Sequence, residues 1–426
     1  MSESRDLSSA QKDALDKILT GAVSSKSTPA LFFGVTNAEG LSYLRAEGTR
    51  IVDDPSSGAI DEDTLFWLCS QTKLITTIAA LQLVEQGKIA LDTPVETVLP
   101  ELANPVVVTA QDETSRKILT TTPAKGKILF RHLLNHTSGL DYTLDETANS
   151  TGPSQGAPSA YVHHYKDGEG ASKFLDIVKG SLSHVPLRFE PGTNFAYGVS
   201  IGCAGFVIER LSGKTLGQYF QDHIFSPLGI TNMTFSLTPT QLKERLLPLS
   251  YRNKRGGVES WKGPDVIEQD RTAVTLHQGG GGIYASLKDY LAILRHLLQI
   301  SAGNAPANAI LGRASVDSMF TPTLPPAVAA QQLSPLIDAF QPHLGIPNGS
   351  AQFGYGLCVN MVDIPGKRRK GTGTWSGWAG TCFFVDRTAG LAAVLGTQLL
   401  PTCDDIMYRT LDALEKVIYA GLENDS

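Results

Sequence analysis

Ser70 and Lys73 are the two residues whose types and spacing best fit a chemical reaction. They lie three positions apart at the start of a helical apolar pattern, so both side chains share one helix face, one turn apart. A serine hydroxyl is a poor nucleophile until a neighbouring base accepts its proton. A lysine amine can be that base when its pKa is lowered. The pair therefore predicts a covalent acyl-enzyme on Ser70.

The context of Ser70 distinguishes it from a chance match. A chain of this length contains about one or two S-x-x-K sequences by chance, and Ser9–Lys12, in the polar N-terminal segment, is one of them. Ser70 instead follows the apolar run 64–69, and the helix after it has buried-face spacing and a stop at Gly87. On spacing alone, Ser70 is either a nucleophile at a helix N-terminus, where negative charge is favoured, or an ordinary N-cap serine.

Tyr197 is the third candidate for this site. A phenol between a serine and a lysine can act as a general base when the nearby cation lowers its pKa. Tyr197 follows the Pro191-Gly192 turn and precedes an amphipathic helical pattern, which is a plausible route into a cleft. Taken alone, a tyrosine in such a position is more often a packed aromatic residue.

Two other patterns would support different chemistry. Gly198–Gly202 matches G-x-S-x-G, which would make Ser200 the nucleophile of an α/β-hydrolase elbow. That elbow requires a strand directly before it, whereas the preceding residues indicate a loop, and the last histidine, His343, comes too early for the triad. His132 and His136 have the spacing of metal ligands but lack the glutamate of a zinc protease motif. We expect a structural role for both histidines.

The composition argues against several classes of protein. A net charge of −6 and a pI near 5.9 argue against a nucleic-acid partner, and the short basic run Lys367–Lys370 indicates a solvated turn. Five scattered cysteines form no C-x-x-C pair, so neither a disulfide framework nor a structural zinc site is expected. The chain has no membrane-spanning apolar segment, and its N-terminus lacks a signal-peptide core. A cytoplasmic location is expected.

The elements around the candidate residues predict the architecture. Strand-like runs occur near both ends of the chain, at residues 30–35, 41–45, 371–375, 381–386 and 391–396. Amphipathic helices are expected at 8–24 and 403–422, and the middle of the chain is mainly helical. Because strands and helices do not alternate, a doubly wound sheet is not expected. The pattern predicts an α/β fold of the α+β type, with one antiparallel sheet built from both termini, flanking helices and an inserted helical domain.

The predicted domains follow from this pattern. They are a discontinuous sheet domain of residues 1–68 and 280–426 and a mainly helical domain of residues 69–279, with the active site in the cleft between them. Two long loop-like segments, 144–170 and 322–349, are either walls of a binding site or tolerated surface insertions. Four glycines at 279–282 lack the Lys-Ser/Thr of a phosphate loop and indicate a turn or a close backbone approach.

Several motifs stand in the order found in class C β-lactamase-like serine hydrolases. Leu68–Thr77 resembles their S-x-x-K helix, and Arg131–Leu140 is similar to their R-H-L-L-x-H-T-S-G-L segment. Phe189–Val199 resembles the region that carries the catalytic tyrosine, and Phe225–Ile230 fits the P-L-G-M signature. The resemblance covers about residues 10–420 and implies the β-lactamase/transpeptidase-like fold.

Within that superfamily, the chain most resembles the fungal lovastatin-type acyltransferases (transesterases), followed by family VIII esterases. The shared features are Tyr197-Gly198 and the approach at Lys125–Ile128. Val199 stands where class C β-lactamases have asparagine, which argues against antibiotic hydrolysis as the main role. Gly202-Cys203 and Trp378–Gly380 depart from the acyltransferase pattern, so the resemblance implies a different acyl or acceptor pocket.

The resemblance assigns roles by position. It implies Ser70 as the nucleophile, Tyr197 as the general base, and Lys73 as the group that holds either in its reactive state. The coupled titration of Lys73 and Tyr197 leaves either one open as the proton acceptor. The backbone N–H groups of Ser70 and Trp378 would form the oxyanion hole. Substrate-binding residues are expected in the segment that replaces the family's K-T-G motif and at one further aromatic residue: Trp375, Ser376, Gly377 and Tyr355.

The resulting expectation is a serine acyltransferase. An acyl group would move from a thioester or ester donor, through acyl-Ser70, to a hydroxyl of a small-molecule, secondary-metabolite-like acceptor. The donor implied by the resemblance is an acyl carrier protein or coenzyme A thioester, and no cofactor, metal, nucleic acid or membrane is expected. A carboxylesterase or β-lactamase-like hydrolase is the alternative, because it shares the acyl-enzyme. A non-catalytic binding protein is disfavoured by the presence of all three candidate residues.

Overall fold

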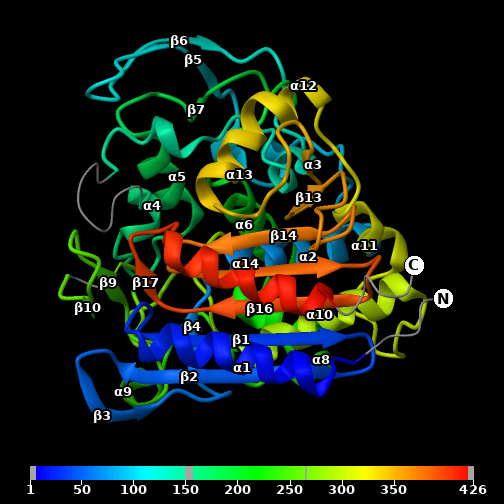
Figure 1. Cartoon of the computed structure of the whole chain (residues 1–426). Helices are drawn as coiled ribbons and strands as arrows, with labels where there is room; N and C mark the ends of the chain where they lie inside the picture. The colour runs from blue at the N-terminus through cyan, green and yellow to red at the C-terminus, as the bar shows by residue number, and fades with distance from the viewer. Residues whose placement is uncertain (1–5, 149–156, 264–265, 421–426) are drawn as a thin grey trace.

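The largest element of the fold is an eight-stranded sheet. The computed structural model describes residues 6–148, 157–263 and 266–420. The strands of the eight-stranded sheet run in the order β12-β13-β14-β15-β16-β1-β2-β3, and every neighbouring pair is antiparallel (Figure 1). Their bounds are β1 (Ala30–Asn37), β2 (Leu41–Ile51), β3 (Asp54–Ala59), β12 (Ala351–Phe353), β13 (Cys358–Asn360), β14 (Gly373–Gly377), β15 (Thr381–Asp386) and β16 (Leu391–Gly396). The predicted sheet from both chain ends is confirmed.

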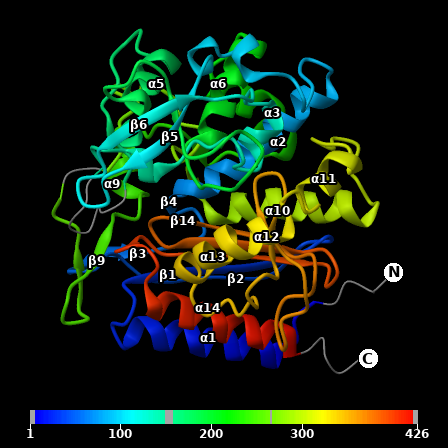
Figure 2. The ribbon, with the colours of Figure 1, turned by 90° about the horizontal axis from the view of Figure 1, so that it is seen from above.

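The two ends of the chain meet in the middle of this sheet. β1 pairs with β16 from Phe32 opposite Gly396 to Asn37 opposite Leu391. All eight residues of β1 are buried, because helices cover both faces. α1 (Ser9–Ser24) and α14 (Asp405–Ala420) lie on one face, and α10 (Leu287–Ala302) lies on the other (Figure 2).

Along the chain, most of the remaining helices come after β4 (Leu65–Trp67) and before β11 (Tyr284–Ser286). The central one is α2 (Thr72–Glu85), which packs against α6 (Ser200–Ser212). Residues 72–83 of α2 are all buried, the polar side chains of Lys73 and Gln82 included. The other helices are α3 (Phe130–Leu134), α4 (Ser159–Val162), α5 (Ala171–Lys179), α7 (Leu216–Phe220), α8 (Ser226–Leu228), α9 (Pro239–Glu244), α11 (Arg313–Met319), α12 (Pro326–Val328) and α13 (Ser334–Phe340).

Short strands that the sequence did not predict lie outside the large sheet, most of them in the middle of the chain. They form three small sheets, which consist of β4, β5 (Val106–Gln111), β6 (Ile118–Pro123), β7 (Pro186–Leu187), β8 (Met233–Thr234), β9 (Ser250–Arg252), β10 (Val258–Ser260), β11 and β17 (Leu399–Leu400). β5 and β6 are rich in valine and threonine, which favour strands once a partner is present. The division into two domains remains a prediction.

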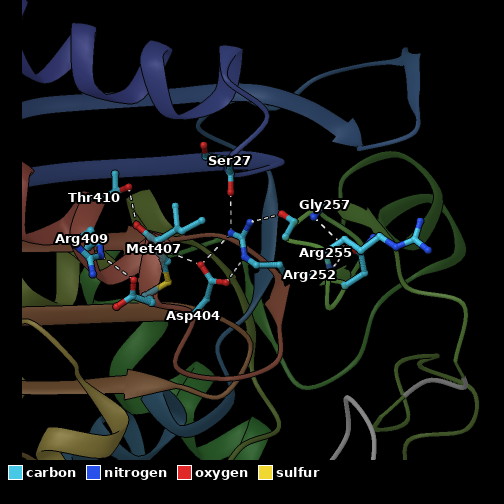
Figure 3. A network of polar contacts seen from close by, with 12 residues as sticks. Ser27, Arg252, Arg255, Gly257, Asp404, Met407, Arg409 and Thr410 are labelled. Carbon is cyan, nitrogen blue, oxygen red and sulfur yellow. Dashed lines mark hydrogen bonds and ion pairs between the residues drawn. The ribbon is translucent and has the colours of Figure 1, made fainter.

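A buried ion pair fastens the β9–β10 hairpin to the sheet. Arg252 contacts the Asp404 carboxylate with two donors and also donates to the Ser27 carbonyl at 2.7 Å (Figure 3). Asp404 in turn accepts from the backbone N–H of Met407 at 3.0 Å, at the start of α14. The ion pair therefore links three segments: Arg252 joins the hairpin to the turn before β1, and Asp404 joins it to the C-terminal helix.

Two sequence interpretations change in the structure. The basic run is not wholly solvated, because Lys367 and Arg368 are buried and pair with Asp412 and Glu415 of α14. The loop-like segment 322–349 contains α12 and α13, whose prolines lie in the first helical turn, where proline is tolerated. Within the described part of the chain, no helix combines the length and apolar character needed to cross a membrane.

Candidate active site

Ser70 lies at the turn between β4 and α2. It belongs to a short 3-10 helix, Cys69–Gln71, and Cys69 has a φ of +49°, which is uncommon for a residue other than glycine. The turn is held because the Leu68 N–H donates to the Ile283 carbonyl at 2.8 Å. One turn further along the helix, Lys73 Nζ lies 3.1 Å from Ser70 Oγ. The predicted pair is therefore in hydrogen-bond contact.

Lys73 is enclosed by the protein. Its side chain is 1% exposed, and its Nζ donates to the Gly280 carbonyl at 2.6 Å. The same nitrogen lies 4.9 Å from the ring centre of Tyr197 and 5.9 Å from that of Tyr161. Burial disfavours the charged amine and lowers the pKa of Lys73 to about 7. A large share of the molecules thus carry a neutral amine beside Ser70 at mildly alkaline pH.

Tyr197 completes the cluster from the loop before α6. Its backbone is held by a 3.3 Å hydrogen bond from Tyr142 N–H to the Tyr197 carbonyl. The indole Nε1 of Trp375 donates to Tyr197 Oη at 3.1 Å. Burial raises the pKa of Tyr197, while hydrogen bonds with Ser70 and Trp375 act in the opposite direction. Because an indole N–H can only donate, the Tyr197 oxygen accepts this bond, and its own O–H is left for the hydrogen bond with Ser70.

The glycine run 279–282 makes the close approach that the sequence indicated. The carbonyls of residues 279, 280 and 281 accept from the side chains of Thr76, Lys73 and Trp67 at 2.6, 2.6 and 2.7 Å. A methyl group on Gly280 would collide with the hydroxyl of Tyr161. The backbone thus packs directly against the reactive cluster, where a larger residue would not fit.

The strand that carries the predicted substrate-binding segment packs against the Ser70 turn. A methyl group on Gly377, the last residue of β14, would collide with the Leu68 carbonyl. Backbone N–H groups of Ala379 and Trp378 lie against the thiol of Cys69, the residue directly before Ser70. The backbone at Trp378 therefore lies beside Cys69, one residue before the candidate nucleophile, and the predicted oxyanion hole remains a prediction.

A cleft opens over these residues. It is lined by Trp67, Cys69, Ser70, Tyr142, Ala157, Pro158, Tyr161, Val162, Tyr197, Val266, Ile267, Gln278, Gly280, Gly281, Phe340, Trp375, Ser376, Gly377, Trp378 and Thr402. Both long segments predicted as walls contribute, residues 157–162 from one and Phe340 from the other. Residues 149–156 of the first segment lie outside the described residues.

The structure does not bring Tyr355 into this cleft. Tyr355 lies in the turn between β12 and β13, half-buried against the core. Phe353, two residues earlier, packs edge-on against Trp375, with ring centres 5.4 Å apart. Tyr161 lines the cleft although the sequence did not single it out. Its only signal was its place in a segment predicted as a wall.

The rival candidates have structural roles. Ser200 is fully buried at the start of α6, and its Oγ shares a 2.8 Å hydrogen bond with Ser138 Oγ. A loop precedes it rather than a buried strand. His132 Nδ1 accepts from the Leu129 N–H at 3.1 Å, and His136 packs 4.7 Å from the Tyr197 ring. Over residues 6–148, 157–263 and 266–420, no cluster of three histidine, cysteine or acidic side chains could hold a metal ion.

Comparison with known proteins places this geometry in a family. The Beta-lactamase family model matches residues 15–415. Monacolin J acid methylbutanoyltransferase of Aspergillus terreus is 31% identical over 412 residues, covering 94% of this chain and 93% of the relative. Lovastatin esterase of Penicillium rubens is 33% identical over 382 residues, covering 87% and 89%.

A solved structure shows the same fold. A mutant of simvastatin synthase from Aspergillus terreus is 30% identical and superposes with a TM-score of 0.78, covering 98% of this chain and 96% of that one. The mixed fold of helices and antiparallel sheet predicted from the sequence is thereby confirmed, as is the resemblance to lovastatin-type acyltransferases and esterases. The chain belongs to the β-lactamase family of serine hydrolases and acyltransferases, alongside a monacolin J acid methylbutanoyltransferase and a lovastatin esterase.

Proposed function

We propose that this enzyme is a serine acyltransferase that forms an acyl-Ser70 intermediate. The observation that carries the proposal is the 3.1 Å contact between Lys73 Nζ and Ser70 Oγ, beneath an aromatic cleft. The relatives include a named methylbutanoyltransferase. A small acyl group, delivered as an ester or thioester, is therefore the proposed donor group. The hydroxyl of a small molecule is the proposed acceptor.

Lys73 is the proposed proton acceptor. Its amine is buried and has a pKa lowered to about 7, and one N–H is committed to the Gly280 carbonyl. The neutral amine keeps a lone pair for the proton of Ser70, so Ser70 Oγ can attack the carbonyl carbon. Burial raises the pKa of Tyr197, which disfavours a phenolate base. We assign Tyr197 instead to passing a proton to the leaving oxygen or sulfur.

The second half of the reaction reverses these steps. Once Lys73 has passed the Ser70 proton on to Tyr197, both groups are neutral again, and an alcohol enters the cleft and attacks the acyl carbonyl as Lys73 takes its proton. The carbon–oxygen bond to Ser70 then breaks, and Lys73 gives that proton to Ser70. The N–H groups of Ser70 and Trp378 are proposed to hold the carbonyl oxygen as it becomes negative, and losing one such donor costs about 10²–10³ in rate.

An esterase is the second candidate, because a relative at 33% identity is a lovastatin esterase. Both activities share the acyl-enzyme and differ in whether alcohol or water attacks it. The test is incubation with an S-butanoyl N-acetylcysteamine thioester and a panel of secondary alcohols, comparing ester product with free butanoate. Excess ester identifies a transferase, and free acid alone identifies a hydrolase.

Peptide mapping after treatment with a fluorophosphonate probe tests the nucleophile. Label on Ser70 is expected, with none after the change Ser70→Ala. Ser200→Ala is the matched control, because Ser200 is the other serine that a motif nominates. Full turnover by the Ser70→Ala enzyme would refute the proposal.

A further inference from the structure

The wall of the cleft carries no charged side chain. Among the residues that the structure describes, none of those lining it is a lysine, arginine, histidine, aspartate or glutamate. The two internal segments outside the description add no cation, since residues 149–156 contain no ionisable side chain and residues 264–265 are Pro-Asp. A substrate carboxylate or phosphate inside the cleft would therefore find no cation to pair with.

The polar groups of the cleft are neutral donors and acceptors. They are hydroxyls, such as those of Tyr142, Ser376 and Thr402, and the amide of Gln278. Gln278 Nε2 donates to the Tyr161 carbonyl at 2.9 Å, and its buried Oε1 has no partner among the described residues. These polar groups are uncharged, so they can exchange hydrogen bonds with a neutral ligand but supply no positive charge to an anion.

The surroundings of the cleft do not supply the missing charge. Lys73 does not itself line the cleft, and its Nζ lies 3.1 Å from Ser70 Oγ and donates to the Gly280 carbonyl, so its charge acts at the reacting atoms and not along the wall. A neighbouring cavity that shares Tyr142 with the cleft contains the carboxylates of Asp141 and Asp145. Asp141 already pairs with Arg188 at 3.1 Å. A ligand anion reaching past the lining there would meet carboxylates.

The rim of the cleft is apolar as well. Val162 and Phe340, on opposite long segments, are each 36% exposed and line the cleft. Trp67 and Trp378 form an edge-on pair inside, with ring centres 5.9 Å apart. Binding an apolar ligand against the apolar rim and interior is favourable because it removes apolar surface from water. A charged ligand would lose its hydration water there without a compensating interaction.

We infer that this cleft selects substrates that are uncharged at every atom inside it: a neutral apolar acyl group, and an alcohol acceptor without carboxylate or phosphate. The inference rests on the proposed function for its turnover test. The inference also predicts a binding preference that does not depend on turnover, so the inference and the proposed function can be refuted independently.

Two esters of equal length test the inference by turnover. They are p-nitrophenyl methyl adipate, which is neutral, and p-nitrophenyl hydrogen adipate, which carries a carboxylate at pH 7.5. We expect kcat/KM for the charged ester to be at least about 100-fold lower, because no group compensates its desolvation. Values within about threefold of each other would overturn the inference.

A charge placed at the rim provides the matched variants. Val162→Lys is expected to lower the ratio of kcat/KM for the neutral ester to kcat/KM for the charged ester about tenfold, whatever it does to the two values separately. Val162→Met, of similar length without charge, is expected to leave the ratio of the two esters unchanged. Phe340→Lys repeats the test from the opposite rim. An unchanged ratio in both lysine variants would count against the inference.

Binding gives a readout that does not need catalysis. Adipic acid monoanilide and its primary amide contain no ester bond, and quenching of tryptophan fluorescence reports occupancy of a cleft that contains Trp67, Trp375 and Trp378. We expect the primary amide to bind about 100-fold more tightly than the acid. Equal affinity would refute the inference even if Ser70 is acylated. Failure of both esters to acylate Ser70, with the affinity difference intact, would instead refute the proposed function alone.

Discussion

The indole nitrogen of Trp375 donates a 3.1 Å hydrogen bond to the phenol oxygen of Tyr197. The two rings also pack, with centres 5.0 Å apart. Trp375 lies on β14 of the large sheet and Tyr197 on the loop before α6, so this bond joins the sheet to the helical part of the molecule. It fixes the direction in which the Tyr197 O–H points.

Trp375→Phe is expected to lower kcat about 3- to 10-fold, the range for loss of one neutral hydrogen bond. The ring is kept, so apolar contacts in the cleft change little. Trp378→Phe is the matched control, an aromatic residue of the same cleft with no bond to Tyr197, and should act mainly on KM. Steady-state kinetics on a p-nitrophenyl ester measures both effects. A Trp375→Phe enzyme with unchanged kcat would contradict the role given to this bond.

The pH profile should follow Lys73. With its pKa lowered to about 7 by burial, the amine is protonated and inactive as a base at lower pH. We expect kcat/KM to rise about tenfold per pH unit below pH 7 and to level off above it. Tyr197→Phe should lower the plateau and keep the midpoint. A midpoint that moves by more than about one unit in this variant would assign the proton to Tyr197 instead.

Lys73→Met is expected to abolish acylation and to increase the free energy of unfolding at pH 7 by about 1–3 kcal/mol. The folded protein lowers the pKa of Lys73, so the unfolded chain binds the proton more tightly. The Lys73 side chain therefore lowers the free energy of unfolding wherever the unfolded chain is protonated. This cost is greatest at and below pH 7 and shrinks as pH approaches the ordinary value of 10.5. The gain should therefore decrease between pH 7 and 9.

Urea unfolding at several pH values measures this gain. Lys88→Met is the matched control, because Lys88 is exposed just beyond the same helix and its replacement should change stability by less than about 0.5 kcal/mol. Equal effects of the two changes at pH 7 would mean that the burial of Lys73 costs nothing.

Two neighbouring glycines offer a sharp steric comparison. A methyl group on Gly280 collides with the Tyr161 hydroxyl, whereas one on Gly281 meets its nearest atoms only at 3.9 Å. Gly280→Ala should lower kcat/KM at least about tenfold and destabilise the fold by about 1–3 kcal/mol. Gly281→Ala should remain within twofold of the parent in kcat/KM. Tyr161→Phe combined with Gly280→Ala should recover part of the loss, and absence of any recovery would place the collision elsewhere.

Asp404 and Asp405 allow a similar comparison for stability. Asp404→Asn leaves Arg252 without its buried partner and should lower the free energy of unfolding by about 2–4 kcal/mol. Asp405 pairs with His343 at the surface, so Asp405→Asn should cost less than about 1 kcal/mol. Thermal or urea unfolding distinguishes the two, and equal losses would contradict the anchoring role of Asp404.

The sequence was most predictive where local pattern and tertiary structure agree. β15 and β16 occur at the predicted bounds because apolar runs flank the turn Arg387–Gly390. β3 was missed, since its polar, exposed residues become a strand only by pairing with β2. Arg368 was expected in solvent because its partner, Glu415, is 47 residues away and no local signal announces it.

In the reactive cluster, too, local spacing could be predicted from the sequence, whereas tertiary contacts could not. Ser70 and Lys73 could be paired from their spacing, and the family resemblance ordered Tyr197 and Trp375 along the chain. The bond between Tyr197 and Trp375 spans 178 residues, and the position of the Tyr161 hydroxyl over Gly280 depends on packing. Such contacts have no periodicity in the sequence. Only the folded chain reveals them.

The pairing of β1 with β16 has a consequence for how the protein is made. During synthesis, β1 leaves the ribosome more than three hundred residues before β16, so one edge of the early β1–β2–β3 unit stays open until residues 391–396 have been made. β14, which brings Trp375 and Gly377 to Ser70, also arrives late. A chain that ends before β14 would therefore contain Ser70, Lys73 and Tyr197 but lack one wall of the cleft. We expect such a fragment to be inactive.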